Sequence, residues 1–187
     1  MEKNSARKIS LENRNALTEE DRMIKSAMIL KNLYMLDAFL RSYKVGMYAS
    51  IGSEVITYPI IGRAQILDKG VAFPLVTDAK ASDMEFRYVL SVSDLKAGYM
   101  SIPEPLLAKT VMEEPDILIM PLTAFDNELN RVGYGKGFYD RYLSKHPSVI
   151  KVGLAYECQK TEHIDTDAND IKCDFIITEE KIYERLQ

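Results

Sequence analysis

The residues with the clearest chemical potential lie in one segment, NRVGYGKGFYDR, at positions 130–141. Its glycines alternate with other residues, and glycine tolerates the positive φ values that bring a backbone close to a ligand. A helix that begins directly after them would add unpaired N–H groups. Four charged side chains accompany the glycines: Arg131, Lys136, Asp140 and Arg141. Together these features predict a cradle for phosphate groups.

Two common phosphate-binding motifs do not fit this segment. A P-loop has Ser or Thr after its lysine, but Gly137 follows Lys136. The dinucleotide-binding motif GxGxxG needs a glycine where Phe138 stands. The predicted cradle is therefore of another type.

The charge of the 187-residue chain is unevenly distributed around a net value of −4, and this net value argues against general nucleic-acid binding. Residues 130–147 carry four basic side chains and one acid, whereas residues 157–187 carry nine acids and four basic side chains. Residues 1–16 are also basic, with four basic side chains and two acids. A small polyanion bound to the two basic segments, with a metal ion between it and the acids, would use all three regions. For any single run, a solvated face without function is the alternative.

Other residue types exclude further classes of protein. Cys158 and Cys173 lack the spacing of zinc ligands and indicate a reducing compartment. No apolar run reaches the roughly 20 residues that span a bilayer. The sequence therefore predicts a cytoplasmic protein without a membrane partner. His146 and His163 are expected at the surface, because neither belongs to a Ser-His-Asp or Cys-His arrangement.

The elements that must position the glycine segment alternate between buried strands and helices. Helices are expected at 18–41, with a capping box at its start, at 57–67 with Thr57 as N-cap, from 138 to 143, and at 179–186. Strands are expected at 45–49, 71–75 with Pro74 at its end, 84–89, 116–121, 149–155 and 175–178. The pattern predicts a single α/β domain over residues 1–187. Its sheet is largely parallel, with helices on both faces in a Rossmann-like arrangement.

Residues 131–143 resemble the signature of the 5-formyltetrahydrofolate cyclo-ligase family, also called 5,10-methenyltetrahydrofolate synthetases. Companion segments occur in the same order along the chain: Lys3 with Arg7 before the first helix, then residues 54–57, 102–105, 116–126, 170–174 and 176–179. The resemblance implies a fold similar to NagB, RpiA and the CoA transferases. It also implies cyclisation of 5-formyltetrahydrofolate to 5,10-methenyltetrahydrofolate, dependent on ATP and Mg²⁺, with release of ADP and phosphate.

The resemblance also implies roles for particular residues. The ATP site would comprise Lys3, Arg7, Arg131, Gly133, Tyr134, Gly135, Lys136, Gly137, Phe138 and Tyr139. The folate site would comprise Ala49, Glu54, Met100, Phe138 and Tyr139. Mg²⁺ would bind Asp140 and Asp170, and the groups acting in catalysis would be Lys136, Tyr139 and Arg141. The expected partners are the small-molecule substrates 5-formyltetrahydrofolate and ATP, without nucleic acid or membrane. The protein would be a monomer or a homodimer.

Several of these residues have structural alternatives. Lys3 and Arg7 could form a solvated tail, and Glu54 could simply precede a helix N-terminus, where acids are favoured. Met100 and Phe138 could belong to the core. The metal role of Asp170 could belong to another acid of residues 165–170.

Three positions depart from the family pattern. Leu122 replaces a glycine, the pair at 129–130 replaces a glycine-containing turn, and Ile56 stands where a second acid is common. These changes predict a differently shaped loop entry and altered substrate contacts. Two other functions remain as alternatives: a non-catalytic module that binds nucleotide or folate, and an isomerase or CoA transferase on a related sheet.

Overall fold

The computed structural model describes residues 1–185, and these residues contain an eight-stranded mixed sheet in the order β12-β11-β10-β7-β1-β2-β3-β6. The parallel centre consists of β11 (Phe175–Ile177), β10 (Ile150–Leu154), β7 (Ile117–Pro121), β1 (Lys44–Gly46) and β2 (Gly70–Asp78). Antiparallel strands extend both edges: β12 (Ile182–Glu184) on one side, β3 (Asp83–Tyr88) and β6 (Val111–Met112) on the other.

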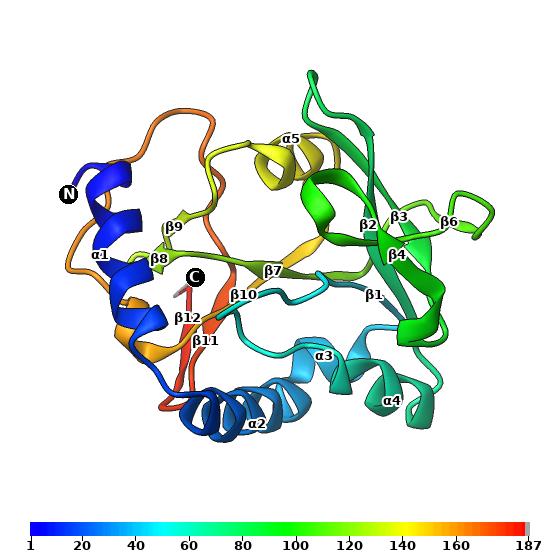
Figure 1. Cartoon of the computed structure of the whole chain (residues 1–187), viewed down its shortest axis with the longest axis horizontal. Helices are drawn as coiled ribbons and strands as arrows, with labels where there is room; N and C mark the ends of the chain where they lie inside the picture. The colour runs from blue at the N-terminus through cyan, green and yellow to red at the C-terminus, as the bar shows by residue number, and fades with distance from the viewer. Residues whose placement is uncertain (186–187) are drawn as a thin grey trace.

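Helices cover both faces of the sheet (Figure 1). On one face lie α2 (Glu19–Met35), α3 (Asp37–Arg41) and α4 (Pro59–Ile66), and on the other lies α5 (Phe138–Lys145). At one end of the sheet, α1 (Lys3–Asn15) lies beside the small hairpin of β8 (Ala124–Phe125) and β9 (Arg131–Val132). This arrangement confirms the predicted α/β fold.

The central strand β7 explains why the core is divided into two layers. Ile117 and Ile119 pack with the α2–α4 layer, whereas Leu118 and Met120 pack with the α5 layer. All four side chains are fully buried. Successive residues of a strand point to opposite faces, so a strand covered on both sides must be apolar throughout.

The remaining connections are short. A second hairpin joins β4 (Leu95–Ala97) to β5 (Pro103–Pro105), and single 3₁₀ turns occur at Val92–Asp94, Tyr99–Ser101 and Glu157–Gln159. Within residues 1–185, none of the helices has the length and apolar character needed to cross a membrane.

The predicted helix at 18–41 is two helices. Its capping box is confirmed, because the Thr18 hydroxyl accepts from the Asp21 N–H at 3.0 Å and the Asp21 carboxylate accepts from the Thr18 N–H. Leu36 is extended, with ψ of 122°, and separates α2 from α3. Its side chain is buried in the core, where the extended backbone directs it.

The prediction of a terminal helix at 179–186 is wrong for residues 179–185, which form no helix. Residues 186–187 lie outside the described part of the chain. The chain turns at Thr178, whose N–H donates to the Lys181 carbonyl, and returns as β12. Tyr183 then packs edge-on against Phe125 with ring centroids 5.3 Å apart. Pairing with β11 and this aromatic contact outweigh the helical tendency of the segment.

Strand β2 continues past Pro74, where the sequence predicted its end. Two residues further on, the Val76 N–H points away from β3 and donates to Glu104 Oε1 at 3.3 Å. The Pro74 nitrogen faces the same side, because alternate residues share an orientation. The missing N–H therefore leaves the β2–β3 ladder intact. The expected N-cap Thr57 also differs: its buried hydroxyl donates to the Tyr48 carbonyl, and α4 begins at Pro59.

Candidate functional site

The glycine loop joins β9 to α5 and has the backbone conformation that its sequence predicts. Gly135 and Gly137 have φ values of +86° and +71°. Gly137 is also the N-cap residue of α5, so the unpaired N–H groups of the first helical turn lie next to the loop. The Gly133 carbonyl accepts a hydrogen bond from Arg7 Nε at 2.9 Å, which connects α1 to the loop.

A pocket of about 560 Å³ lies where this loop and the start of α5 meet residues 167–171 and the tip of the β2–β3 hairpin. Its lining contains five of the residues predicted for the site: Lys136, Gly137, Asp140, Arg141 and Asp170. The volume is in the range of ordinary ligand sites, about 300–1,000 Å³. Tertiary structure thus brings the basic loop and the acidic C-terminal region together, as the charge distribution predicted.

Each predicted metal ligand is paired with a predicted phosphate ligand. Arg131 Nη2 lies 2.7 Å from Asp140 Oδ1, and the Asp140 carboxylate also accepts from the Ile171 N–H at 3.2 Å. Lys3 Nζ lies 2.5 Å from Asp170 Oδ2 and 2.6 Å from Asp167 Oδ2. Burial lowers the pKa of Lys3, but its bonds to these two carboxylates outweigh burial and hold that pKa above its usual value. Each of the two predicted metal-binding carboxylates is therefore neutralised by a neighbouring cation.

The donor set suits Mg²⁺ bound together with a nucleotide better than a metal held by protein alone. Among residues 1–185, no three side chains of Asp, Glu, His or Cys gather closely enough to hold a metal ion by themselves. Magnesium bound to nucleotide usually takes one or two carboxylates, with phosphate oxygens and waters completing an octahedron. Asp140 and Asp170 line one pocket and supply two such carboxylates.

Glu54 does not line this pocket and is buried, with 6% of its surface exposed. Its Oε1 accepts from the Tyr134 hydroxyl at 2.6 Å and its Oε2 accepts from the Ile51 N–H at 2.9 Å. Burial raises the pKa of Glu54, while these two bonds and the charge of Arg14 oppose the rise. Neither of these two bonds comes from α4, which begins at Pro59, so the alternative role before a helix N-terminus gains no support from the hydrogen bonds of Glu54.

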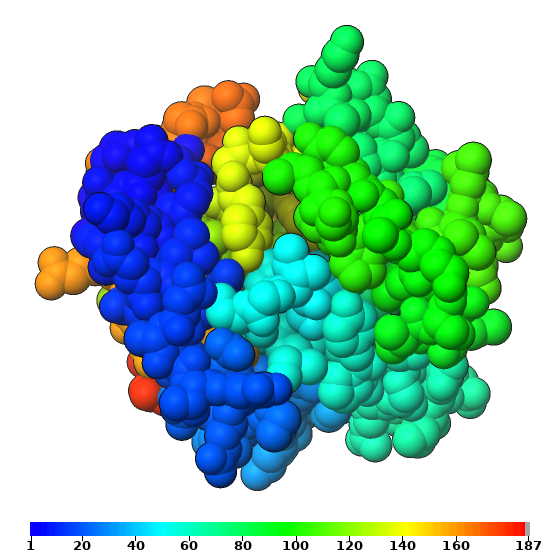
Figure 2. Space-filling view, viewed as in Figure 1, coloured from blue at the N-terminus to red at the C-terminus, as the bar shows by residue number. Residues whose placement is uncertain are grey.

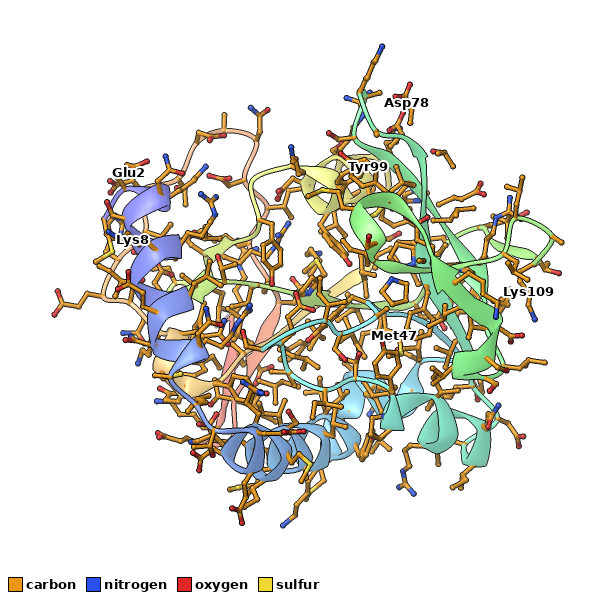
Figure 3. All side chains as sticks on the ribbon, in the orientation of Figure 1. Glu2, Lys8, Met47, Asp78, Tyr99 and Lys109 are labelled. Atoms are coloured by element: carbon orange, nitrogen blue, oxygen red, sulfur yellow. The ribbon has the colours of Figure 1, made fainter. Side chains whose placement is uncertain are left out.

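Aromatic side chains flank the remaining side of the site. Phe138 packs edge-on against Tyr99 with ring centroids 5.9 Å apart, and Figure 3 labels Tyr99 beside the start of α5. Tyr139 lies under the Arg131 guanidinium, 5.9 Å from it to the ring centroid. Burial raises the pKa of Tyr139, so its hydroxyl is protonated.

Two predicted folate residues have contrasting positions. Met100 is 66% exposed and has a φ of +53°, so it is not a core residue. Ala49 is buried in the α2–α4 layer of the core, with 4% exposure. A contact from Ala49 to a ligand would therefore come from its backbone.

The predicted catalytic cations differ in their surroundings. Lys136 is exposed and lines the pocket. Arg141 also lines it, but its Nε donates to Asp83 Oδ1 at 2.8 Å, and the same oxygen accepts from Lys145 at 2.6 Å. Arg141 thus links α5 to the β2–β3 hairpin, whose tip Figure 3 marks at Asp78.

The sequence analysis placed Lys3 and Arg7 before the first helix, but both belong to α1. The alternative of a solvated tail is also wrong, because both side chains contact the site. Arg14, Asp83 and Tyr99 were not predicted for the site, and Asp167 was included only as an acid of residues 165–170 that could replace Asp170. Arg14 had a detectable signal, since spacings of four and seven place it on the same helical face as Lys3 and Arg7. That signal requires knowing that the segment is helical.

The fold and site define an α/β enzyme class in which a glycine cradle and cations face two carboxylates, the combination that nucleotide phosphates and a divalent ion require. Comparisons with known proteins identify the family. The sequence model of the 5-formyltetrahydrofolate cyclo-ligase family matches residues 1–179. The chain belongs to this family.

Individual relatives match along most of their length. The 5-formyltetrahydrofolate cyclo-ligase of Escherichia coli K12 is 30% identical over 176 residues, covering 91% of this chain and 97% of the relative. The enzyme of the same name from Haemophilus influenzae is 36% identical over 68% of this chain and 71% of its own. The solved 5,10-methenyltetrahydrofolate synthetase of Aquifex aeolicus superimposes with a TM-score of 0.84 at 33% identity, covering 99% and 93% of the two chains.

A second solved structure, the synthetase of Mycoplasma pneumoniae, gives a TM-score of 0.77 at 25% identity, covering 96% of this chain and 99% of that one. The activity of the chain is therefore that of a 5-formyltetrahydrofolate cyclo-ligase, an ATP-dependent ligase of folate metabolism. The predicted family and its cyclo-ligase activity are confirmed.

Proposed function

We propose that the pocket between the glycine loop and residues 167–171 binds the phosphates of MgATP, and that 5-formyltetrahydrofolate binds in the adjoining hollow. Figure 2 shows this hollow where the yellow glycine loop meets the cyan segment near residue 50 and the green segment near residue 100. The same three segments contact one another: Tyr134 of the glycine loop donates to Glu54, and Tyr99 packs against Phe138. A flat pterin ring suits such a partly aromatic wall.

The ion pairs of the pocket support an exchange of partners when MgATP binds. Lys3 and Arg131 are held on carboxylates at distances of 2.5 and 2.7 Å. Triphosphate oxygens offer these cations stronger anionic partners. As the cations move to phosphate, Asp140 and Asp170 become free to ligate Mg²⁺. Nucleotide and metal should therefore each strengthen the binding of the other.

The chemistry requires positioning and charge stabilisation rather than a protein nucleophile. The formyl oxygen attacks the γ-phosphorus of ATP and ADP leaves; N10 then attacks the activated formyl carbon and phosphate leaves. Loop N–H groups and Lys136 would stabilise charge on the transferred phosphoryl group. Mg²⁺ would neutralise charge shared between the phosphates. The protonated Tyr139 hydroxyl and Arg141 would help to orient the reacting groups.

A single observation carries this proposal: Asp140 and Asp170, the predicted metal ligands, line one pocket, and each forms an ion pair with a predicted phosphate ligand, Arg131 and Lys3 respectively. The test is the appearance of methenyltetrahydrofolate absorbance with and without MgATP, in the natural protein and in Asp140→Ala. Asp165→Ala is the matched control, because Asp165 belongs to the same acidic stretch but pairs with the chain's amino terminus.

We expect turnover that needs MgATP, is lost in Asp140→Ala and survives in Asp165→Ala. Equal turnover in all three proteins would exclude Asp140 from the metal site. Saturable binding of folate or nucleotide without turnover in the natural protein would instead favour the non-catalytic binding module.

A further inference from the structure

Arg14, in the last turn of α1, is a buried charge that the proposed ligand contacts do not use. Only 4% of its surface is exposed. Its nitrogen atoms donate to three neutral acceptors in the described part of the chain: Ser53 Oγ at 3.0 Å, the Tyr134 hydroxyl at 3.0 Å and the Leu122 carbonyl at 3.5 Å. A buried charge is costly unless an opposite charge compensates it.

The compensating charge lies one hydrogen bond further away. Arginine has only donors, so the Tyr134 oxygen must accept from Arg14. The single proton of that hydroxyl is then left for Glu54 Oε1, 2.6 Å away. Both hydrogen bonds therefore point the same way: Arg14 donates to Tyr134, and Tyr134 donates to Glu54. The cation lies at one end of this pair of bonds and the carboxylate at the other.

A parallel bond fixes the residue next to Glu54. Ser53 Oγ accepts from Arg14 Nε and donates its own proton to Asn15 Oδ1 at 2.5 Å. Arg14 therefore connects α1 to two parts of the site at once, the segment containing Glu54 and the glycine loop containing Tyr134.

We propose that Arg14 is a positioning residue for folate binding: it directs the Tyr134 hydroxyl proton to Glu54 and keeps the Glu54 carboxylate ionised and in one orientation. This inference rests on the proposed contact between Glu54 and the folate. An ionised, oriented carboxylate can accept two hydrogen bonds from the N–H groups at the polar edge of a pterin. This role uses the hydroxyl of Tyr134, whereas the proposed phosphate contacts use the backbone N–H groups of the loop and Lys136.

The electrostatics of Glu54 agree with this geometry. Burial raises its pKa, and the Tyr134 bond and the charge of Arg14 counteract the rise. The other titratable groups that feel its charge are tyrosines whose pKa values are raised by burial, so they stay neutral: Tyr48, Tyr58, Tyr134 and Tyr139. Arg14 is thus the positive charge that acts on this carboxylate.

The test measures equilibrium binding of 5-formyltetrahydrofolate without nucleotide, by titration calorimetry, so that no turnover is needed. Four variants are compared with the natural protein: Arg14→Gln, Tyr134→Phe, their double variant and Arg14→Lys. Lys8→Gln is the matched control, because it removes a positive charge from an exposed position on the same helix. The Kd of MgATP is measured for each protein.

Arg14→Gln and Tyr134→Phe should each raise the folate Kd about tenfold, the effect of losing one charge-assisted hydrogen bond. The double variant should be no weaker than either single variant, because the two residues act in series. Lys8→Gln should bind folate normally, and the Kd of MgATP should be unchanged in Arg14→Gln. Additive losses, or an equal loss of MgATP affinity, would overturn the proposal in favour of a general structural role.

The pH dependence of folate affinity distinguishes this role from a purely structural one, which would leave the pH midpoint unchanged. Folate affinity should fall as the pH falls through the pKa of Glu54, since only the ionised form accepts both bonds. Removing the Arg14 charge raises the pKa of Glu54 further. The loss of folate affinity should therefore begin at a higher pH in Arg14→Gln than in the natural protein. In Arg14→Lys, which keeps the charge, it should begin near the same pH as in the natural protein. An unmoved midpoint in Arg14→Gln contradicts the proposal. If Arg14→Gln does not fold, a normal folate Kd in Tyr134→Phe contradicts it equally.

Glu54→Gln separates this inference from the proposed function. Normal folate affinity in Glu54→Gln would remove the folate contact on which both rest. Weakened affinity in Glu54→Gln together with normal affinity in Arg14→Gln would overturn only the positioning role.

Discussion

Replacing the glycines of the loop by alanine one at a time should have unequal effects, although the three positions look equivalent in sequence. Gly135 and Gly137 have positive φ, whereas Gly133 does not. A Cβ added at Gly133 would meet only Arg131 Nη1 at 3.6 Å, an ordinary contact, and one at Gly137 would meet nothing within 4 Å. One at Gly135 would lie 3.3 Å from Arg7 Nη2.

These differences convert into free energies of unfolding. A left-handed conformation costs a residue with a Cβ roughly 1–2 kcal/mol, while alanine lowers the entropy of the unfolded chain by about 0.4–1 kcal/mol. Gly137→Ala should therefore destabilise by about 1 kcal/mol, and a chain of this size loses roughly 2–4 °C in Tm for each kcal/mol. Gly133→Ala gains the entropy effect without strain, so its Tm should be equal to or above that of the natural protein.

Gly135→Ala combines the same strain with a displaced Arg7. Its Tm should match that of Gly137→Ala, but the weakened bond from Arg7 to the Gly133 carbonyl should also lower the affinity for MgATP. Calorimetric melting of the three variants, with a titration of MgATP into each, provides both measurements. A Tm for Gly133→Ala as low as that for Gly137→Ala would refute the reasoning, because no strain or close contact in the structure could account for it.

Three further outcomes are expected. Asp140→Asn should remove the dependence of ATP affinity on Mg²⁺, because an amide is a poor magnesium ligand; titrations with and without Mg²⁺ decide this, and an unchanged dependence excludes the role. Thr18→Ala deletes the acceptor of the capping bond at the start of α2 and should cost about 1 kcal/mol in urea unfolding; no loss would show that the cap is not needed. Cys173 is fully buried, and burial raises the pKa of its thiol to about 12. Mass spectrometry should find it alkylated by iodoacetamide only after unfolding, and rapid labelling of the native protein would contradict this.

Local patterns predicted much of the fold. The apolar run of β7, the capping box of α2 and the glycine followed by α5 were each recognisable, because their signals lie within a few residues. The extension of β2 past Pro74 and the strand β12 were not. Both involve contacts with residues distant in sequence: Glu104 accepts from the Val76 N–H of β2, and Tyr183 of β12 packs against Phe125.

The candidate site divides in the same way. The glycine loop and its charges are local and were identified directly, and the resemblance to the family supplied Lys3, Glu54 and Asp170. Arg14 was not predicted, because its partner Tyr134 lies 120 positions away in the sequence. Asp167 was only one of several candidates among residues 165–170, because the sequence does not show that Lys3 lies beside it.

By itself, the sequence determined a glycine loop before a helix, a doubly covered parallel sheet and the family to which the chain belongs. Only the tertiary structure decided which cation faces which carboxylate, and that Arg14 reaches Glu54 through Tyr134. The physical reason is that glycine conformation and apolar periodicity are properties of short segments. Ion pairs and buried hydrogen bonds instead depend on distances of a few ångströms, which exist only after the segments have packed together.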